Sequence, residues 1–97
     1  MNDALPEVHD NPQLSRWEAR LDDELAGFAE YTLDGTTVTF THTETDPRFG
    51  GRGVGGALAR TALDAARAAG RDVVPQCPFF AGWIGKHPDY ADLVAAS

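Results

Sequence analysis

The sequence has only one cysteine, no long apolar run and little positive charge, and each shortage excludes a class of protein. A single cysteine, Cys77, rules out an internal disulfide. No apolar stretch is long enough to span a bilayer, and the polar, acidic opening is unlike a signal peptide. The formal charge of −7 argues against nucleic-acid and anionic-membrane binding, because both depend on clustered lysine and arginine. We therefore expect a cytoplasmic protein with no nucleic-acid or membrane partner.

The residues of several common chemistries are also missing. The three histidines and the one cysteine show no metal-ligand spacing, so no metal site is expected. No serine lies in a nucleophile-elbow pattern. A chain of 97 residues with 42% hydrophobic content is enough for one domain with a small core. Any ligand site should therefore be built from the ends of a few helices and strands. The sequence does not indicate an oligomeric state.

The beginning of the chain contains two prolines and little periodicity, so residues 1–13 are expected to form a flexible N-terminal arm. A single domain should then cover residues 14–97. Its first half shows the alternation of apolar and polar residues that is typical of strands. Asp34-Gly35 favours a tight hairpin, so the strands should form an antiparallel meander. Three strands are predicted, over residues 15–21, 25–33 and 36–44.

The second half of the chain changes to a helical period. A helix is predicted over residues 54–69, with Gly70 at its C-terminal end. A short strand over residues 72–76 and a short helix over residues 79–86 should follow. A strand–helix–strand connection of this kind is right-handed and makes its two strands parallel. The predicted fold class is therefore α/β with a mixed sheet: an antiparallel three-strand meander, a β-α-β crossover and a short C-terminal helix.

This topology brings distant residues to one edge of the sheet. In open α/β sheets, ligands bind beyond the carboxyl ends of the parallel strands. The third strand ends with His42 and Glu44, which the alternation places on the same side as Phe40. The other parallel strand ends with Gln76 and Cys77. We therefore predict a binding site where these two strand ends meet the glycine-rich turn.

The turn from Gly50 to Gly56 contains five glycines, more than a simple strand-to-helix turn requires. Backbone N–H groups without side chains can approach a phosphate, and the positive end of the helix dipole favours the anion. Arg52 and Arg48 could add charge. The alternative interpretation is a tight turn with close packing. A dinucleotide fold fits poorly, since Asp72 would begin its strand rather than end it, and no Lys-Ser or Lys-Thr follows for a triphosphate loop.

Four blocks of sequence occur at informative spacing: THTE at 41–44, GRGVGGAL at 51–58, QCPF at 76–79 and HPDY at 87–90. In this order they resemble the small YjdJ-type branch of the GNAT N-acetyltransferase superfamily. The match covers residues 15–94. It implies a minimal GNAT-like fold that transfers an acetyl group from acetyl-CoA (coenzyme A) to an amine acceptor. The acceptor would be a small molecule, a polyamine or a protein lysine.

The resemblance also implies where the cofactor lies. The pyrophosphate would sit on the backbone amides of the glycine turn, and the pantetheine arm between the two parallel strands where they separate. This chain has Gly50 where the superfamily usually has Gln or Arg, which leaves more of the binding to backbone groups. The implied cofactor-binding residues are Thr43, Glu44, Gly51, Arg52, Gly53, Val54, Gly55, Gly56 and Cys77.

Amine acetylation needs a base for the amine and a proton source for the departing thiolate. Glu44 is the first candidate base, because a carboxylate partly buried beside Phe40 would have a raised pKa. His42 is the rival, since its ordinary pKa already suits the task. Cys77 could accept the acetyl group or donate a proton, and the alternative is an inert, half-buried thiol. Tyr90 is a further candidate proton donor or a packing residue.

Two functions remain open at this point. The first is an acetyl-CoA-dependent N-acetyltransferase. The second is a non-catalytic module on the same fold that binds acyl-CoA or a partner protein. The aromatic residues bear on this choice: they are interpreted mainly as core, but an exposed cluster at Phe79–Trp83 could be a partner surface. These aromatic residues are Trp17, Phe79, Phe80 and Trp83.

Overall fold

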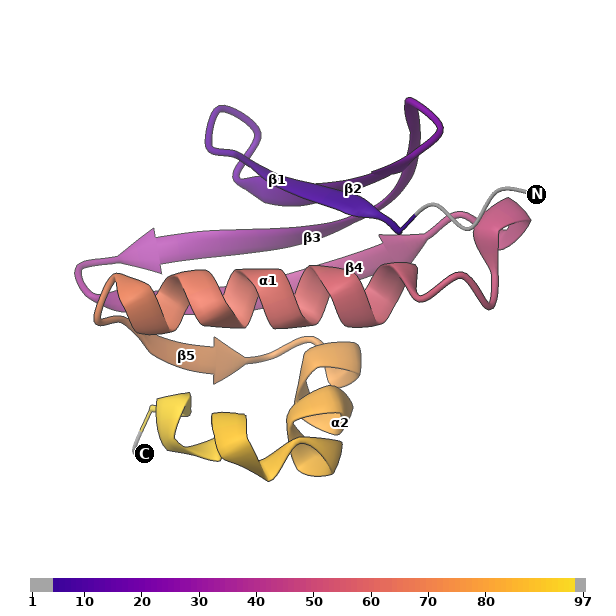
Figure 1. The fold of residues 1–97 in the computed structure, drawn as a ribbon. Helices are drawn as coiled ribbons and strands as arrows, with labels where there is room; N and C mark the ends of the chain where they lie inside the picture. Colours follow the sequence, from indigo (N-terminus) through magenta and orange to yellow (C-terminus); the bar gives the residue numbers. More distant parts are fainter. Residues whose placement is uncertain (1–4, 96–97) are drawn as a thin grey trace.

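The computed structural model describes residues 5–95, which form one five-stranded sheet with helices packed on one side (Figure 1). The strands follow chain order across the sheet: β1 (Glu7–Asn11), β2 (Arg16–Leu21), β3 (Glu24–Asp34), β4 (Thr37–Thr45) and β5 (Asp72–Pro75). The helices are α1 (Val54–Ala68) and α2 (Pro78–Lys86), with 3₁₀ segments η1 (Pro47–Phe49) and η2 (Pro88–Leu93).

The predicted fold class is confirmed. Strands β2, β3 and β4 form the antiparallel meander, and β5 lies parallel to β4 after the α1 crossover. The hairpin between β3 and β4 turns at Gly35, whose φ of 61° only glycine adopts easily. At the other end of α1, Gly70 has a φ of 70° and ends the helix as predicted. Within residues 5–95, no helix is both long and apolar enough to cross a bilayer.

The prediction of a flexible arm over residues 1–13 is wrong for residues 7–11. This segment forms β1, an edge strand paired antiparallel with β2 from Glu7↔Arg20 to Asn11↔Arg16. Only Val8 packs against the core, so burial does not alternate along β1. For this reason the sequence of this segment shows little hydrophobic periodicity. Backbone pairing with β2, rather than burial of apolar side chains, therefore holds this segment in place. Residues 1–4 lie outside the described part of the chain.

Each of two strands carries one extra residue that interrupts the regular pairing. In β3 the extra residue is Ala26, between the pairs Ala19↔Gly27 and Arg20↔Leu25. In β4 it is Thr41, between the pairs Tyr31↔Phe40 and Glu30↔His42. Such a bulge changes which side chains share a face of the sheet.

The core lies between the sheet and the helices. Phe40 of β4 is 1% exposed, and its ring stacks on that of Phe80 in α2 at 4.2 Å. The helix α1 crosses the same face of the sheet (Figure 1) and buries Leu58, Ala62 and Leu63. Not every predicted core aromatic is buried, since Phe79 is 40% exposed. All described helices thus lie on one side, called here the helix face, and the opposite side is the open face.

Candidate functional site

His42 and Glu44 do not share a face with Phe40, contrary to the sequence prediction. Because Thr41 is an extra residue, the strand alternation shifts after Phe40. His42 pairs with Glu30 and Glu44 pairs with Phe28, so both side chains lie on the open face. The alternation of β4 could not reveal this, since a bulge at a threonine in a threonine-rich strand leaves no sequence signal.

The two side chains nevertheless form a pair. The distance from His42 Nε2 to Glu44 Oε2 is 2.8 Å, and the His42 ring lies 6.2 Å from that of Phe28. The prediction that Glu44 is partly buried is wrong, because its side chain is 61% exposed. The pair is therefore open to solvent and to an incoming molecule.

A pocket of about 310 Å³ opens beside Glu44. It lies between the start of β3 and the end of β4, and sequence reasoning did not find it because its walls come from two strand ends. Asp46 lines it, and hydrogen bonds from the side chain and backbone N–H of Arg48 hold the pKa of this carboxyl below its ordinary value. The pocket is lined by Leu25, Ala26, Gly27, Phe28, Glu44, Thr45, Asp46 and Pro47.

Beyond Phe40, β4 and β5 separate. Their parallel pairing runs from Thr37↔Asp72 to Phe40↔Pro75 and ends there. Cys77 closes the junction, with its backbone N–H donating to the Phe40 carbonyl at 2.9 Å. Its Sγ lies 3.2 Å from Thr43 Oγ1, and the residue is only 3% exposed. Thus Thr43 and Cys77 meet on the helix face, on the other side of β4 from Glu44.

The glycine turn leads into α1 with free amide groups. Gly51 and Gly53 both have a φ of 77°, which disfavours any residue with a side chain. Gly53 begins the helix without a side-chain cap, and the first turn contains no acidic residue. Within the described part of the chain, the backbone N–H groups of Val54, Gly55 and Gly56 have no acceptor. This first turn can therefore hold an anion such as a phosphate.

Packing also explains one of the glycines. A Cβ at Gly55 would lie 2.7 Å from Phe79 Cζ, so the ring of Phe79 occupies the place where a side chain at position 55 would stand. At Gly56 a Cβ would meet Trp83 Nε1 at 3.6 Å, an ordinary contact. The alternative interpretation of tight packing therefore applies to Gly55, whereas Gly56 has no such requirement.

Tyr90 lies apart from the other predicted catalytic residues. Its hydroxyl donates to Asp64 Oδ1 at 2.7 Å and accepts from Arg60 Nη1 at 3.3 Å, both on α1. The bond to Asp64, together with burial, raises the pKa of Tyr90. The ring packs 5.2 Å from Trp83. Through these contacts, Tyr90 attaches η2 to α1.

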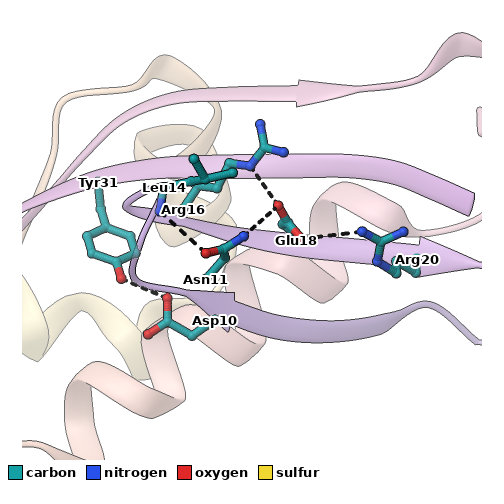
Figure 2. Close-up of polar contacts among 7 residues, drawn as sticks. All are labelled: Asp10, Asn11, Leu14, Arg16, Glu18, Arg20 and Tyr31. Atoms are coloured by element: carbon teal, nitrogen blue, oxygen red, sulfur yellow. Dashed lines mark hydrogen bonds and ion pairs between the residues drawn. The ribbon is translucent and has the colours of Figure 1, made fainter.

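The open face carries a polar network around Glu18 (Figure 2). The carboxylate of Glu18 accepts from Arg16 Nε at 2.8 Å and from Asn11 Nδ2 at 3.2 Å, and Arg20 lies 3.5 Å away. Burial raises the pKa of Glu18, but these hydrogen bonds outweigh it and leave the pKa below its ordinary value. The guanidinium of Arg16 also covers Phe28, which joins this network to the His42 side of the face.

The fold and the turn together define a class of protein: a mixed α/β sheet in which a glycine-rich turn presents backbone amides beside two separating parallel strands. The sequence matches the family described as GCN5-related N-acetyl-transferase over residues 16–93, and the chain therefore belongs to that family. N-acetyl transfer is the activity of this class. Comparison with curated proteins finds no match.

A solved structure has the same fold. The solution structure of a GCN5-like candidate N-acetyltransferase from Staphylococcus aureus matches with a TM-score of 0.72. The match covers 94% of this chain and 89% of that one at 19% identity. At this identity the similarity shows the shared fold.

Proposed function

We propose that the chain is an acetyl-CoA-dependent N-acetyltransferase of the small YjdJ-type branch, and that its acceptor is an amine bound on the open face. The observation that carries the proposal is the combination of unpartnered amides at the start of α1 with the separation of β4 from β5. Phosphates fit these amides, since an uncapped helix N-terminus attracts anions. Cys77 lies where the pairing of these two strands ends, and the gap that would take the pantetheine arm begins there.

The residues that would hold acetyl-CoA come from both features. Gly51 to Gly56 would bind the pyrophosphate through backbone groups, with Arg52 adding charge. Thr43, Glu44 and Cys77 would line the gap. When bound, acetyl-CoA supplies the thioester carbonyl that an amine attacks.

The chain's own groups would then divide the proton chemistry between the two faces of β4. On the open face, the side chains of Glu44 and His42 form a hydrogen-bonded pair, with Nε2 and Oε2 2.8 Å apart, and this pair would take the proton that an attacking amine loses. The adjoining pocket offers the acceptor an apolar wall at Phe28 and a carboxylate at Glu44. On the helix face, Thr43 Oγ1 lies 3.2 Å from the Cys77 thiol, and Cys77 would act there as a proton donor to the departing thiolate or as a nucleophile. An acidic chain would also attract a cationic amine.

Turnover assays test the assignment of the base. We expect Glu44→Gln and His42→Gln to lower kcat by about 10²–10⁴-fold, the usual contribution of a general base, while acetyl-CoA binding persists. The assay would follow thiol release with a panel of a polyamine, simple primary amines and a lysine peptide. Glu30→Gln is the matched control, because Glu30 pairs with His42 across the open face and lies outside the pocket.

Two results would overturn the proposal. Full turnover in both Glu44→Gln and His42→Gln would show that neither residue is the base. Binding of acetyl-CoA without turnover on any acceptor of the panel would instead favour a non-catalytic acyl-CoA-binding module.

A further inference from the structure

A second cavity, separate from the glycine turn, lies between the sheet and the C-terminal half of α1. Its volume is about 190 Å³, and we call it the distal cavity. Ala62 of α1 lines it, eight residues after Val54, which places it about 12 Å farther along the helix axis. None of the residues assigned above to acetyl-CoA or to the acceptor lines this cavity.

The walls of the distal cavity are mainly apolar. Trp17 and Phe40 contribute aromatic surface from the sheet, and Ala62 and Ala65 contribute small side chains from the helix. A space of this size equals the liquid volume of on the order of six water molecules. It therefore suits an apolar group the size of one amino-acid side chain, and it is smaller than most pockets for drug-sized ligands.

One side of the cavity carries a carboxylate with a free oxygen. Tyr31 donates its hydroxyl hydrogen to Asp10 Oδ1 at 2.7 Å (Figure 2), and no other described group bonds to Oδ2. Burial and the bond to Asp10 raise the pKa of Tyr31 to about 12, so the phenol remains a hydrogen-bond donor. Asp10 Oδ2 is thus available to a cationic group.

Arg71 supplies the opposite charge. It lines the cavity and is half-buried, and its charge acts on the Tyr31 hydroxyl. Unlike Arg16, Arg48 and Arg67, it forms no ion pair and no side-chain hydrogen bond within residues 5–95. A half-buried guanidinium without an acceptor favours a carboxylate ligand, because Arg binds carboxylates through two parallel hydrogen bonds.

We propose that the distal cavity binds a free α-amino acid with an apolar side chain. Its ammonium group would contact Asp10, its carboxylate would contact Arg71, and its side chain would lie between Trp17 and Ala65. The three features of such a molecule match the three features of the cavity: a carboxylate, a guanidinium and an apolar space of 190 Å³. The site does not depend on acetyl-CoA.

The proposal is tested by titrating the full chain with L-phenylalanine while recording amide and indole signals by NMR. We expect saturable shifts at the Trp17 indole and at Ala65, and at least tenfold weaker binding of phenethylamine and of 3-phenylpropanoate, each of which lacks one charge. Arg71→Gln and Asp10→Asn should each weaken L-phenylalanine binding at least tenfold. Arg20→Gln is the matched control, because this arginine lies on the open face and should leave binding unchanged.

A variant that fills the distal cavity tests whether L-phenylalanine binds there or elsewhere on the chain. Ala65→Leu should abolish L-phenylalanine binding and raise the Tm, since leucine keeps the helix and fills the space. The proposal is overturned if L-phenylalanine gives no saturable shifts, if shifts occur at Gly53–Gly56 instead, or if Ala65→Leu binds as the wild type does. Equal binding by Arg71→Gln and the wild type would also overturn it.

Discussion

The two halves of β4 perform different tasks. Residues 37–40 pair with strands on both sides and place Phe40 in the core. Residues 42–45 pair only with β3 and present His42 and Glu44 to solvent. The extra residue Thr41 separates the two halves. The comparison teaches that a single inserted residue can turn the side chains that follow it toward the other face of a sheet, here away from the core and toward solvent.

We expect the largest loss of stability from a substitution in residues 37–40, the half of β4 that pairs with strands on both sides. Phe40→Ala removes a ring that is 1% exposed and stacked on Phe80, so we expect a loss of about 3–5 kcal/mol in the free energy of unfolding. Urea denaturation measures it. His42→Ala in the other half should cost under about 0.5 kcal/mol, as is usual for exposed positions. Equal costs for the two variants would contradict the division of β4.

Deletion of Thr41 tests the bulge itself. Both flanking pairs, Tyr31↔Phe40 and Glu30↔His42, can persist in a regular ladder, so we expect cooperative unfolding to be retained. The separation from β5 should be reduced, and acetyl-CoA should bind at least tenfold more weakly in calorimetry. If the folded deletion variant binds acetyl-CoA as the wild type does, the bulge is not part of the site.

The glycine turn offers a smaller, matched comparison of two alanine variants. Gly51 has a φ of 77°, so Gly51→Ala should lower the free energy of unfolding by about 1 kcal/mol. Gly56 is helical and has room for a Cβ, so Gly56→Ala should raise it by up to about 1 kcal/mol. Thermal unfolding gives both values. A destabilised Gly56→Ala would show that the first turn of α1 is packed more tightly than described.

We expect the smallest change in stability from a substitution of Tyr31, which pairs with Phe40. Its pKa rises from an ordinary 10 to about 12 in the folded chain. Folding therefore favours the protonated phenol, and this contribution to stability is fully present below pH 10 and is lost as the pH rises toward 12. Tyr31→Phe should cost about 1 kcal/mol at neutral pH and remove this part of the alkaline loss. Chemical denaturation at pH 8 and at higher pH measures it; an unchanged alkaline slope in the variant would contradict the assignment.

Much of the fold could be predicted from the sequence because hydrophobic periodicity reports burial directly. The alternation of Gly27, Ala29 and Tyr31 and the helical stripe of Leu58 and Ala62 both correspond to buried faces, whereas Leu25 and Leu33 at the ends of the same alternation are not buried. The strand β1 escaped prediction since its side chains are mostly exposed, so its sequence pattern carries no sign of the backbone pairing that holds it.

The sequence was enough to locate the site, but not to predict on which face of the sheet each of its side chains lies. Topology alone placed Glu44, Cys77 and the glycine turn at the carboxyl ends of the two parallel strands. Their faces could not be predicted, because the position of a bulge depends on pairing with β3 rather than on local sequence. The packing role of Gly55 was equally hidden, since it arises from Phe79 in another helix.

Calorimetric titration with acetyl-CoA is the most direct test of the central claim, that the first turn of α1 holds the cofactor phosphates. The decisive variant is Gly56→Glu, because a carboxylate near the helix N-terminus favours the fold but repels phosphate. We predict that the wild type binds acetyl-CoA and CoA, that Gly56→Glu remains folded and binds at least tenfold more weakly, and that Gly56→Gln binds better than Gly56→Glu. No binding by the wild type at millimolar acetyl-CoA, or equal binding by Gly56→Glu, would contradict the claim.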